Sequence, residues 1–150
     1  MIGGSIKQVK YNIYRAIAAG DTAFVTHYLS TGRDPNPFEQ SGWILLICAV
    51  EYENKEIMDI LITIGADINY QCSGGWTALH QAVDLSIDGT IQTGGSPGEE
   101  PVEILEYLLD RGADVPITDS KGSSPINVAM SCKSEKIGQF LEEYLPVQPE

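Results

Sequence analysis

The sequence lacks the features that would attach it to a membrane. No apolar run approaches the ~20 residues that a membrane-spanning helix needs. The first five residues, Met-Ile-Gly-Gly-Ser, show no basic-then-apolar secretion signal. Ile2 stands where a myristoylated chain has glycine. We therefore expect a cytoplasmic protein with no membrane partner.

Basic residues are also scarce. The 150 residues include 9 lysines and arginines against 21 aspartates and glutamates, which gives a formal net charge of -12. Contacts to phosphates need the opposite balance, so we expect no nucleic-acid partner. An acidic body attracts basic proteins, but acidity can equally serve solubility alone, and both interpretations stay open.

Cysteine and histidine are too few for common catalytic or metal-binding arrangements. An odd number of cysteines without a Cys-x-x-Cys pair argues against a disulfide framework and against a zinc site. We expect reduced thiols at Cys48, Cys72 and Cys132. Two histidines, His27 and His80, lie far apart in the chain, and neither is paired with a nucleophile. The sequence therefore predicts no catalytic residue, no cofactor and no metal ion.

The chain does contain an internal repeat. Gly42-Trp43 and Gly75-Trp76 are 33 positions apart, and so are Gly32 and Gly65. The frame that opens at Gly75-Trp76 closes at Gly112-Ala113-Asp114. A fixed period of this length is typical of a stacked repeat protein. We place four units at about residues 9–38, 39–71, 72–118 and 119–145, within one domain of residues 1–150.

Each unit has the apolar spacing of two amphipathic helices, which predicts an all-α fold. In the second unit we expect a helix over residues 44–52, and in the third a helix over residues 77–85 followed by another that begins near Pro101. Cap residues are expected at Asp21, Asn54 and Ser134, and a helix-closing glycine at Gly65.

The third unit is longer than the second between its two helices. From Val50 to Ile57 is 7 residues, whereas from Val83 to Ile104 is 21, so the insertion has 14 residues and spans about 85–98. Long connections in compact domains are usually functional or disordered. Two isoleucines in it could pack against the stack, at positions 87 and 91, and its glycines could instead leave it mobile.

The repeat resembles the ankyrin repeat. The family frame Gly-x-Thr-Pro-Leu-His-x-Ala is matched by Gly75 to Ala82, and Glu-x-Val-x-x-Leu-Leu-x-x-Gly-Ala-Asp is matched by Glu103 to Asp114. Ile44 and Ile47 depart from it in the second unit. The resemblance implies a solenoid of four helix-turn-helix units with short projecting hairpin loops, in which Thr77 and His80 brace the turn.

The resemblance also implies a protein-binding face, formed by the loops and the first helix of each unit. Trp43 and Trp76 occupy a position that the family usually exposes, where they can anchor a partner or pack across neighbouring loops. The remaining candidates supply an aromatic surface edged by acids. We expect protein binding by Trp43, Glu51, Tyr52, Tyr70, Trp76, Asp84 and Leu85.

Two functions fit such a surface. The first is inhibition of one basic partner, as in the bacterial immunity proteins of toxin systems, because the chain is short, acidic and apparently complete. The second is an adaptor or regulatory scaffold that joins proteins without inhibiting them. In both cases we expect a non-enzymatic protein that is a monomer or forms a 1:1 complex with a partner carrying a basic surface.

Overall fold

The computed structural model describes residues 12–33, 35 and 44–147 of the chain. Within these residues the regular structure is helical, and no strand occurs, which confirms the all-α prediction. The elements are α1 (Ile13–Ala19), α2 (Thr22–Ser30), α3 (Leu45–Glu51), α4 (Lys55–Ile64), the 3-10 turn η1 (Ser73–Gly75), α5 (Ala78–Gln92), α6 (Glu103–Asp110), α7 (Pro125–Ser131) and α8 (Glu135–Glu142).

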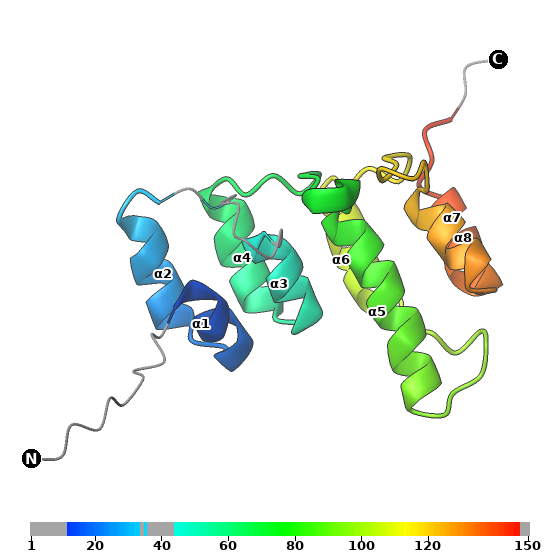
Figure 1. The fold of residues 1–150 in the computed structure, drawn as a ribbon, viewed down its shortest axis with the longest axis horizontal. Helices are drawn as coiled ribbons and strands as arrows, with labels where there is room; N and C mark the ends of the chain where they lie inside the picture. Colours follow the sequence, from blue (N-terminus) through cyan, green and yellow to red (C-terminus); the bar gives the residue numbers. More distant parts are fainter. Residues whose placement is uncertain (1–11, 34, 36–43, 148–150) are drawn as a thin grey trace, which may run out of the picture.

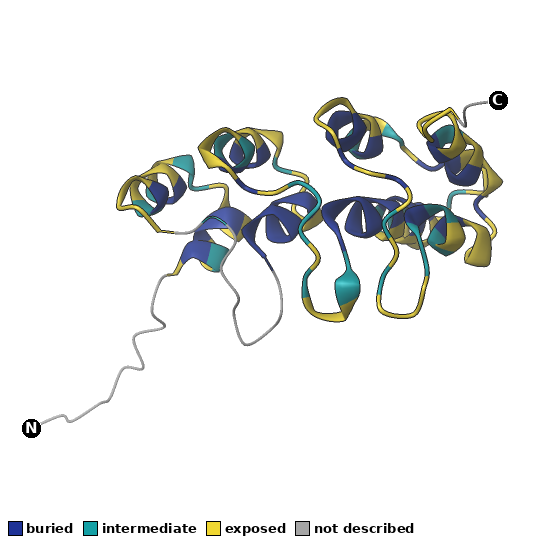
Figure 2. Ribbon diagram, turned by 90° about the horizontal axis from the view of Figure 1, so that it is seen from above, coloured by how far each residue is buried: buried dark blue, intermediate teal, exposed yellow. Residues whose placement is uncertain are grey.

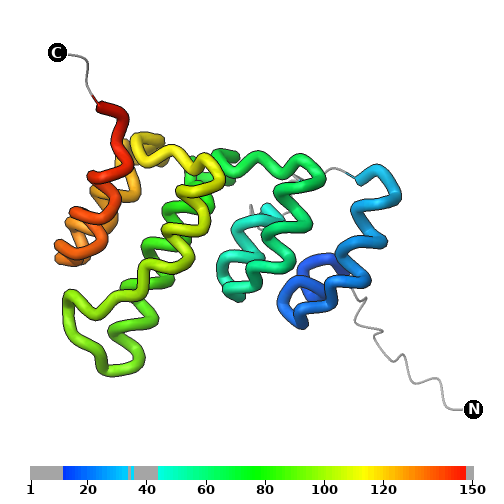
Figure 3. The backbone as a smooth tube through the Cα atoms, turned by 180° about the vertical axis from the view of Figure 1, so that it is seen from behind, coloured from blue at the N-terminus to red at the C-terminus, as the bar shows by residue number. Residues whose placement is uncertain are grey.

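The eight α-helices of the described residues pair in chain order into four antiparallel pairs, which stand side by side (Figure 1). First helices contact one another along the stack, from α1 through α3 and α5 to α7, while each second helix packs on its own first helix. Viewed from above, the helices form two layers, and the loops that lead into the third and fourth units project beyond one of them (Figure 2). The tube seen from behind shows the same four pairs (Figure 3). This is the predicted solenoid.

Local signals in the sequence fix most helix ends. The side chains of Asp21 and Asn54 each accept a hydrogen bond of 3.0 Å from the backbone N–H three residues later. Gly65 closes α4 at a φ of 111°, a left-handed conformation that favours glycine. The prediction for Ser134 is wrong in part, since it occupies the cap position of α8 but its side chain makes no capping hydrogen bond.

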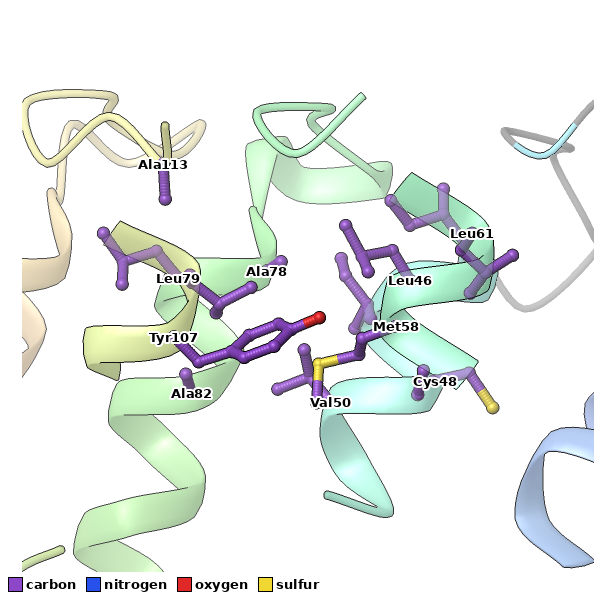
Figure 4. Close-up of a cluster of buried hydrophobic side chains, with 14 of the residues drawn as sticks. Leu46, Cys48, Val50, Met58, Leu61, Ala78, Leu79, Ala82, Tyr107 and Ala113 are labelled. Atoms are coloured by element: carbon purple, nitrogen blue, oxygen red, sulfur yellow. The ribbon is translucent and has the colours of Figure 1, made fainter. Parts of the chain in front are cut away.

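Apolar side chains from adjacent pairs merge into one core. Figure 4 shows this core between the second and third units, where Leu46 and Met58 face Leu79 and Tyr107. Leu46, Met58 and Leu79 are almost fully buried. Because a single helix pair cannot cover its own apolar face, this shared core is what stabilises the stack.

Polar contacts also stabilise the interface between the second and third units. The Tyr107 hydroxyl donates to the Asp59 carboxylate, and the Arg111 guanidinium lies 3.6 Å from the centre of the Tyr107 ring. Arg111 also forms an ion pair with Asp59 at 3.1 Å. Burial first, and then the hydrogen bond to Asp59, raise the pKa of Tyr107, so the phenol remains protonated.

The loops between units are joined by side-chain hydrogen bonds to backbone groups. The Asn69 side chain accepts from the backbone N–H of Asp114 at 2.8 Å and donates to the carbonyl of Gly112 at 3.1 Å. The Gln71 side chain donates to the carbonyls of Gly75 and Thr118. Consecutive loops therefore hold each other in register.

The insertion is the main difference from the sequence prediction. The sequence predicts that the first helix of the third unit ends at Leu85, but α5 continues to Gln92. The extra turns are stabilised by packing, because Ile87 is only 6% exposed. Ile91, by contrast, is 66% exposed and does not pack on the stack. The second helix also begins later than Pro101, at Glu103.

Candidate protein-binding surface

The Trp76 side chain is half-buried at the start of α5. Its indole Nε1 donates a hydrogen bond of 3.1 Å to the side-chain oxygen of Gln81. Its ring centre lies 4.8 Å from that of His80, with the planes tilted by 32°. Trp76 is thus held in one orientation and still offers part of its ring to solvent, a combination that suits an interface anchor.

Gln81 connects Trp76 to the neighbouring unit. Its side-chain nitrogen donates to the Glu51 carboxylate across a distance of 2.5 Å. A row of three side chains, Trp76, Gln81 and Glu51, therefore crosses from α5 to α3. Gln81 is not among the predicted binding residues, because its role depends on the neighbouring first helix and not on any local motif.

The candidate residues at the ends of these first helices are more exposed. Tyr52 follows α3 and is 53% exposed, so much of its side chain is open to a partner. Asp84 lies on the exposed side of α5, and Leu85 beside it is half-buried. Desolvation, and then the carboxylate of Asp88 one turn away, raise the pKa of Asp84.

We use the term first-helix surface for the side chains that line the first-helix layer in the second and third units. It combines a half-buried indole, an exposed phenol, two carboxylates and a leucine, and one amide links the indole to one of the carboxylates. Its members are Glu51, Tyr52, Trp76, Gln81, Asp84 and Leu85.

The other two candidates stand apart from this set. Tyr70 is half-buried in the loop before the third unit and packs against the core. Trp43 lies outside the described residues, so its place on the surface stays a prediction.

His80 has a structural role. It is fully buried, and its Nδ1 lies 2.7 Å from the Thr77 hydroxyl, while its Nε2 lies 2.9 Å from the carbonyl oxygen of Ser123 in the next unit. Thr77 also caps α5 in a reciprocal arrangement with His80. Burial lowers the pKa of His80, although the Ser123 carbonyl and Asp119 oppose this. The neutral ring thus braces the turn, as the resemblance implied.

The described residues offer little basis for metal or thiol chemistry. No group of three or more histidine, cysteine or acidic side chains among them is arranged to hold a metal ion. The three cysteines are free thiols, and burial in particular raises the pKa of Cys48 to about 11. Among the helices that the structure describes, none has the length and apolar character to cross a bilayer.

Stacked helix pairs, loops in register and a surface of aromatic and acidic side chains define a solenoid protein of the interaction-module class. A family model described as "Ankyrin repeats (3 copies)" matches residues 13–92, just over half of the chain, and a single ankyrin repeat model matches residues 74–120. The chain belongs to the ankyrin repeat family. As in that family generally, its repeats form a protein-protein interaction module.

Relatives of the chain are diverse. It is 34% identical over 94 residues to the human 2-5A-dependent ribonuclease, covering 62% of this chain and 11% of that protein. It is 31% identical over 108 residues to the fowlpox virus (strain NVSL) ankyrin repeat protein FPV031, covering 69% of this chain and 28% of that protein. It is 33% identical over 76 residues to the ankyrin repeat-containing protein P1E11.10 of Schizosaccharomyces pombe, covering 51% of this chain and 37% of that protein. The chain thus spans less than two fifths of each of these relatives.

Proposed function

We propose that the chain binds a basic protein through its first-helix surface and inhibits that protein. The observation that carries this proposal is the row of Trp76, Gln81 and Glu51, which links two units. The row presents an ordered aromatic ring beside the Glu51 carboxylate. Ordering before binding reduces the entropy lost on association.

Charge favours a basic partner. Acidic residues exceed basic ones by 12 in the whole chain, and the surface itself contains Glu51 and Asp84. Complementary charge accelerates encounter more than it increases affinity. A fast-acting inhibitor of a basic toxin, as in bacterial immunity, benefits from this property, and we propose immunity as the specific form of the function.

Protection and complex formation test this proposal together. The protein is co-expressed with the product of its neighbouring gene, and both cell survival and a purified 1:1 complex are measured. Protection with a tight 1:1 complex is the expected result. Absence of both binding and protection would exclude the inhibitor role. Recovery of several partners in one larger assembly would instead favour an adaptor, the second candidate, for which the same surface would serve.

Two alanine variants separate binding from folding. Tyr52→Ala removes an exposed ring, so its free energy of unfolding should change by no more than about 0.5 kcal/mol, while affinity for the partner falls about tenfold or more. Leu79→Ala, in contrast, removes a side chain that is 1% exposed and should cost ~2–5 kcal/mol of stability. Urea unfolding and titration calorimetry measure the two quantities.

Trp76→Ala should lose an amount of stability between those lost by Tyr52→Ala and Leu79→Ala. Because Trp76 is half-buried and hydrogen-bonded, its loss should lower stability less than the loss of Leu79 does, while binding weakens by ~2 kcal/mol or more. If Trp76→Ala and Leu79→Ala lose equal stability, and Trp76→Ala binds normally once folded, then Trp76 is a packing residue and the proposed anchor is wrong.

A further inference from the structure

The extension of α5 creates a feature that the other units lack. This helix has 15 residues, whereas α3 and α7 have 7 each. Eight further residues correspond to ~12 Å of additional helix. The extension projects from the stack at the end opposite the loops between units, beyond α3 and α4 (Figures 1 and 3). One flank of α5 is therefore left without a neighbouring first helix.

The segment that returns from α5 to α6 is held in place by hydrogen bonds. The Ser86 hydroxyl donates to the Pro101 carbonyl at 2.5 Å. The Glu100 carboxylate accepts from the backbone N–H of Gly98 at 2.7 Å. From the fourth unit, the Lys136 ammonium donates to the Glu100 carbonyl at 2.7 Å. The segment is thus anchored both to α5 and to α8.

Glu100 is the central residue of this anchor. It is 3% exposed, and burial alone would raise its pKa. The backbone N–H groups of Glu100 and Gly98, together with the Ser134 hydroxyl and the charge of Lys136, outweigh burial and lower the pKa. The carboxylate therefore stays ionised and keeps the returning segment in one conformation.

Between this segment, α5 and the turn that precedes α4 lies a groove of about 740 Å³. We call it the extension groove. Its apolar part includes Leu85, Ile104 and Leu105, and Gly89 lies along the α5 side. A volume of this size is within the range of sites that hold a small molecule or a few side chains.

The edge of the extension groove is acidic. Glu53, Glu99 and Glu103 line it, against a single base, Lys55. The Lys55 ammonium lies 6.0 Å from the centre of the Tyr107 ring, in a cation-π contact. The Glu99 carboxylate accepts a hydrogen bond of 2.7 Å from the backbone N–H of Ser96. An apolar floor under an acidic edge therefore faces solvent.

Gly89 widens the groove at a cost to the helix. Glycine is a poor helix former, and it lies in the interior of α5. A Cβ atom added there would meet no other atom within 4 Å. No close contact in the protein therefore requires glycine at this position, whereas a ligand in the groove would benefit from the space.

A long basic side chain has both an apolar stem, which suits the floor of the groove, and a positive charge, which suits its acidic edge. Arginine and lysine have aliphatic stems that pack on apolar surface and cationic ends that remain near the solvent. We propose that the extension groove binds an arginine- or lysine-bearing, partly apolar segment of a partner protein. The groove shares Leu85 with the first-helix surface and is otherwise lined by different residues. The proposal rests on the proposed function for the basic character of the partner.

Fluorescein-labelled synthetic peptides provide the probe. Leu-Arg-Leu-Arg-Leu should bind the full chain, with a dissociation constant at least tenfold below that of Leu-Glu-Leu-Glu-Leu, as measured by fluorescence anisotropy. The double variant E53Q/E103Q should weaken binding of the arginine peptide about fivefold. Equal binding of both peptides, or no binding of the arginine peptide at millimolar protein, would overturn the proposal.

Gly89→Leu is the decisive variant, because it fills the groove and removes a glycine from a helix interior. It should melt no lower than wild type and bind the arginine peptide at least tenfold more weakly. Ala23→Leu, which adds an exposed leucine to α2 far from the groove, is the matched control and should bind normally. Unchanged peptide binding by a folded Gly89→Leu protein would exclude the groove.

The same variants separate this inference from the proposed function. If the partner still binds Gly89→Leu but no longer binds Trp76→Ala, the groove proposal is wrong and the first-helix surface stands. If the arginine peptide binds the groove but no basic partner binds the chain, the groove stands and the proposed function is wrong.

Discussion

At the scale of single residues, His80 shows how one side chain joins two units. Its ring contacts Thr77 on one side and the carbonyl of Ser123 on the other. Since the Thr77 backbone N–H donates to Nδ1 at 3.2 Å, the proton of the neutral ring is on Nε2, which donates to Ser123. A second proton would have to displace the bond at Nδ1.

Stability should therefore decrease in mild acid. Burial lowers the pKa of His80 below its ordinary value of 6.5, so the unfolded chain takes up a proton at a higher pH than the folded chain. The contribution of His80 is fully present above pH 6.5 and is lost as the pH falls toward the lowered value. Urea unfolding at pH 7.5, 6.5 and 5.5 measures this slope.

Two variants assign the slope to His80. His80→Gln should unfold at lower urea concentration and show a smaller loss of stability between pH 7.5 and 5.5 than wild type. His27→Gln, at an exposed position of α2, should keep the wild-type slope. A wild-type slope in His80→Gln would contradict the role given to this ring.

The roles of residues that belong to the repeat motif could be predicted from the sequence. The roles of residues that depend on contacts with a neighbouring unit could not. Thr77 and His80 were identified because the repeat frame specifies both. Gln81 was missed, although it connects Trp76 to Glu51, because its partners are fixed only once α3 and α5 lie side by side. The half-buried state of Trp76 also depends on that packing, which a repeat pattern alone does not determine.

At the scale of elements, close contact between loops limits the side chain at Gly75. Gly75 has a φ of 75°, and a Cβ atom there would lie 2.8 Å from the backbone nitrogen of Ser120. Gly112 has a φ of 95° but no atom within 4 Å of such a Cβ. Both positions need the left-handed conformation, and Gly75 also needs the space.

Gly112→Ala should therefore lose about 1–3 kcal/mol from backbone strain. Gly75→Ala should lose more, because it must also move the next loop, which donates from Ser120 to the carbonyl of Gly74 at 2.9 Å. Chemical denaturation of both variants provides the comparison. Equal losses would mean that the two loops separate at little cost and that their contact adds nothing to stability.

The end of α5 shows where prediction from sequence fails for elements. The segment Asp88-Gly89-Thr90-Ile91-Gln92 contains a glycine and two β-branched residues, so local propensity argues against a helix. Tertiary contacts outweigh that preference, since Ile87 and Thr90 are buried and the Ser86 hydroxyl is bonded to Pro101. Helices with clear cap residues, such as α2 and α4, were predicted correctly because their end signals are local.

At the scale of the whole molecule, the stack is held by apolar contact between units and opposed by its own charge. The 21 acidic residues exceed the 9 basic ones by 12. Few of these charges are paired: the ion pair found among the described residues joins Arg111 to Asp59. Salt therefore has little attraction to weaken and much repulsion to screen.

Added salt should accordingly stabilise the protein. Between 10 and 500 mM NaCl the Debye length falls from ~30 Å to a few Å, so repulsion between carboxylates on adjacent units is largely removed. A gain of about 1 kcal/mol would raise the melting temperature by ~2–4 °C in a chain of this size. Calorimetry in NaCl and in KCl should give equal shifts, because screening depends on ionic strength and not on the cation. A melting temperature that falls with salt would show that attractive charge pairs, and not net repulsion, dominate the electrostatics of the stack.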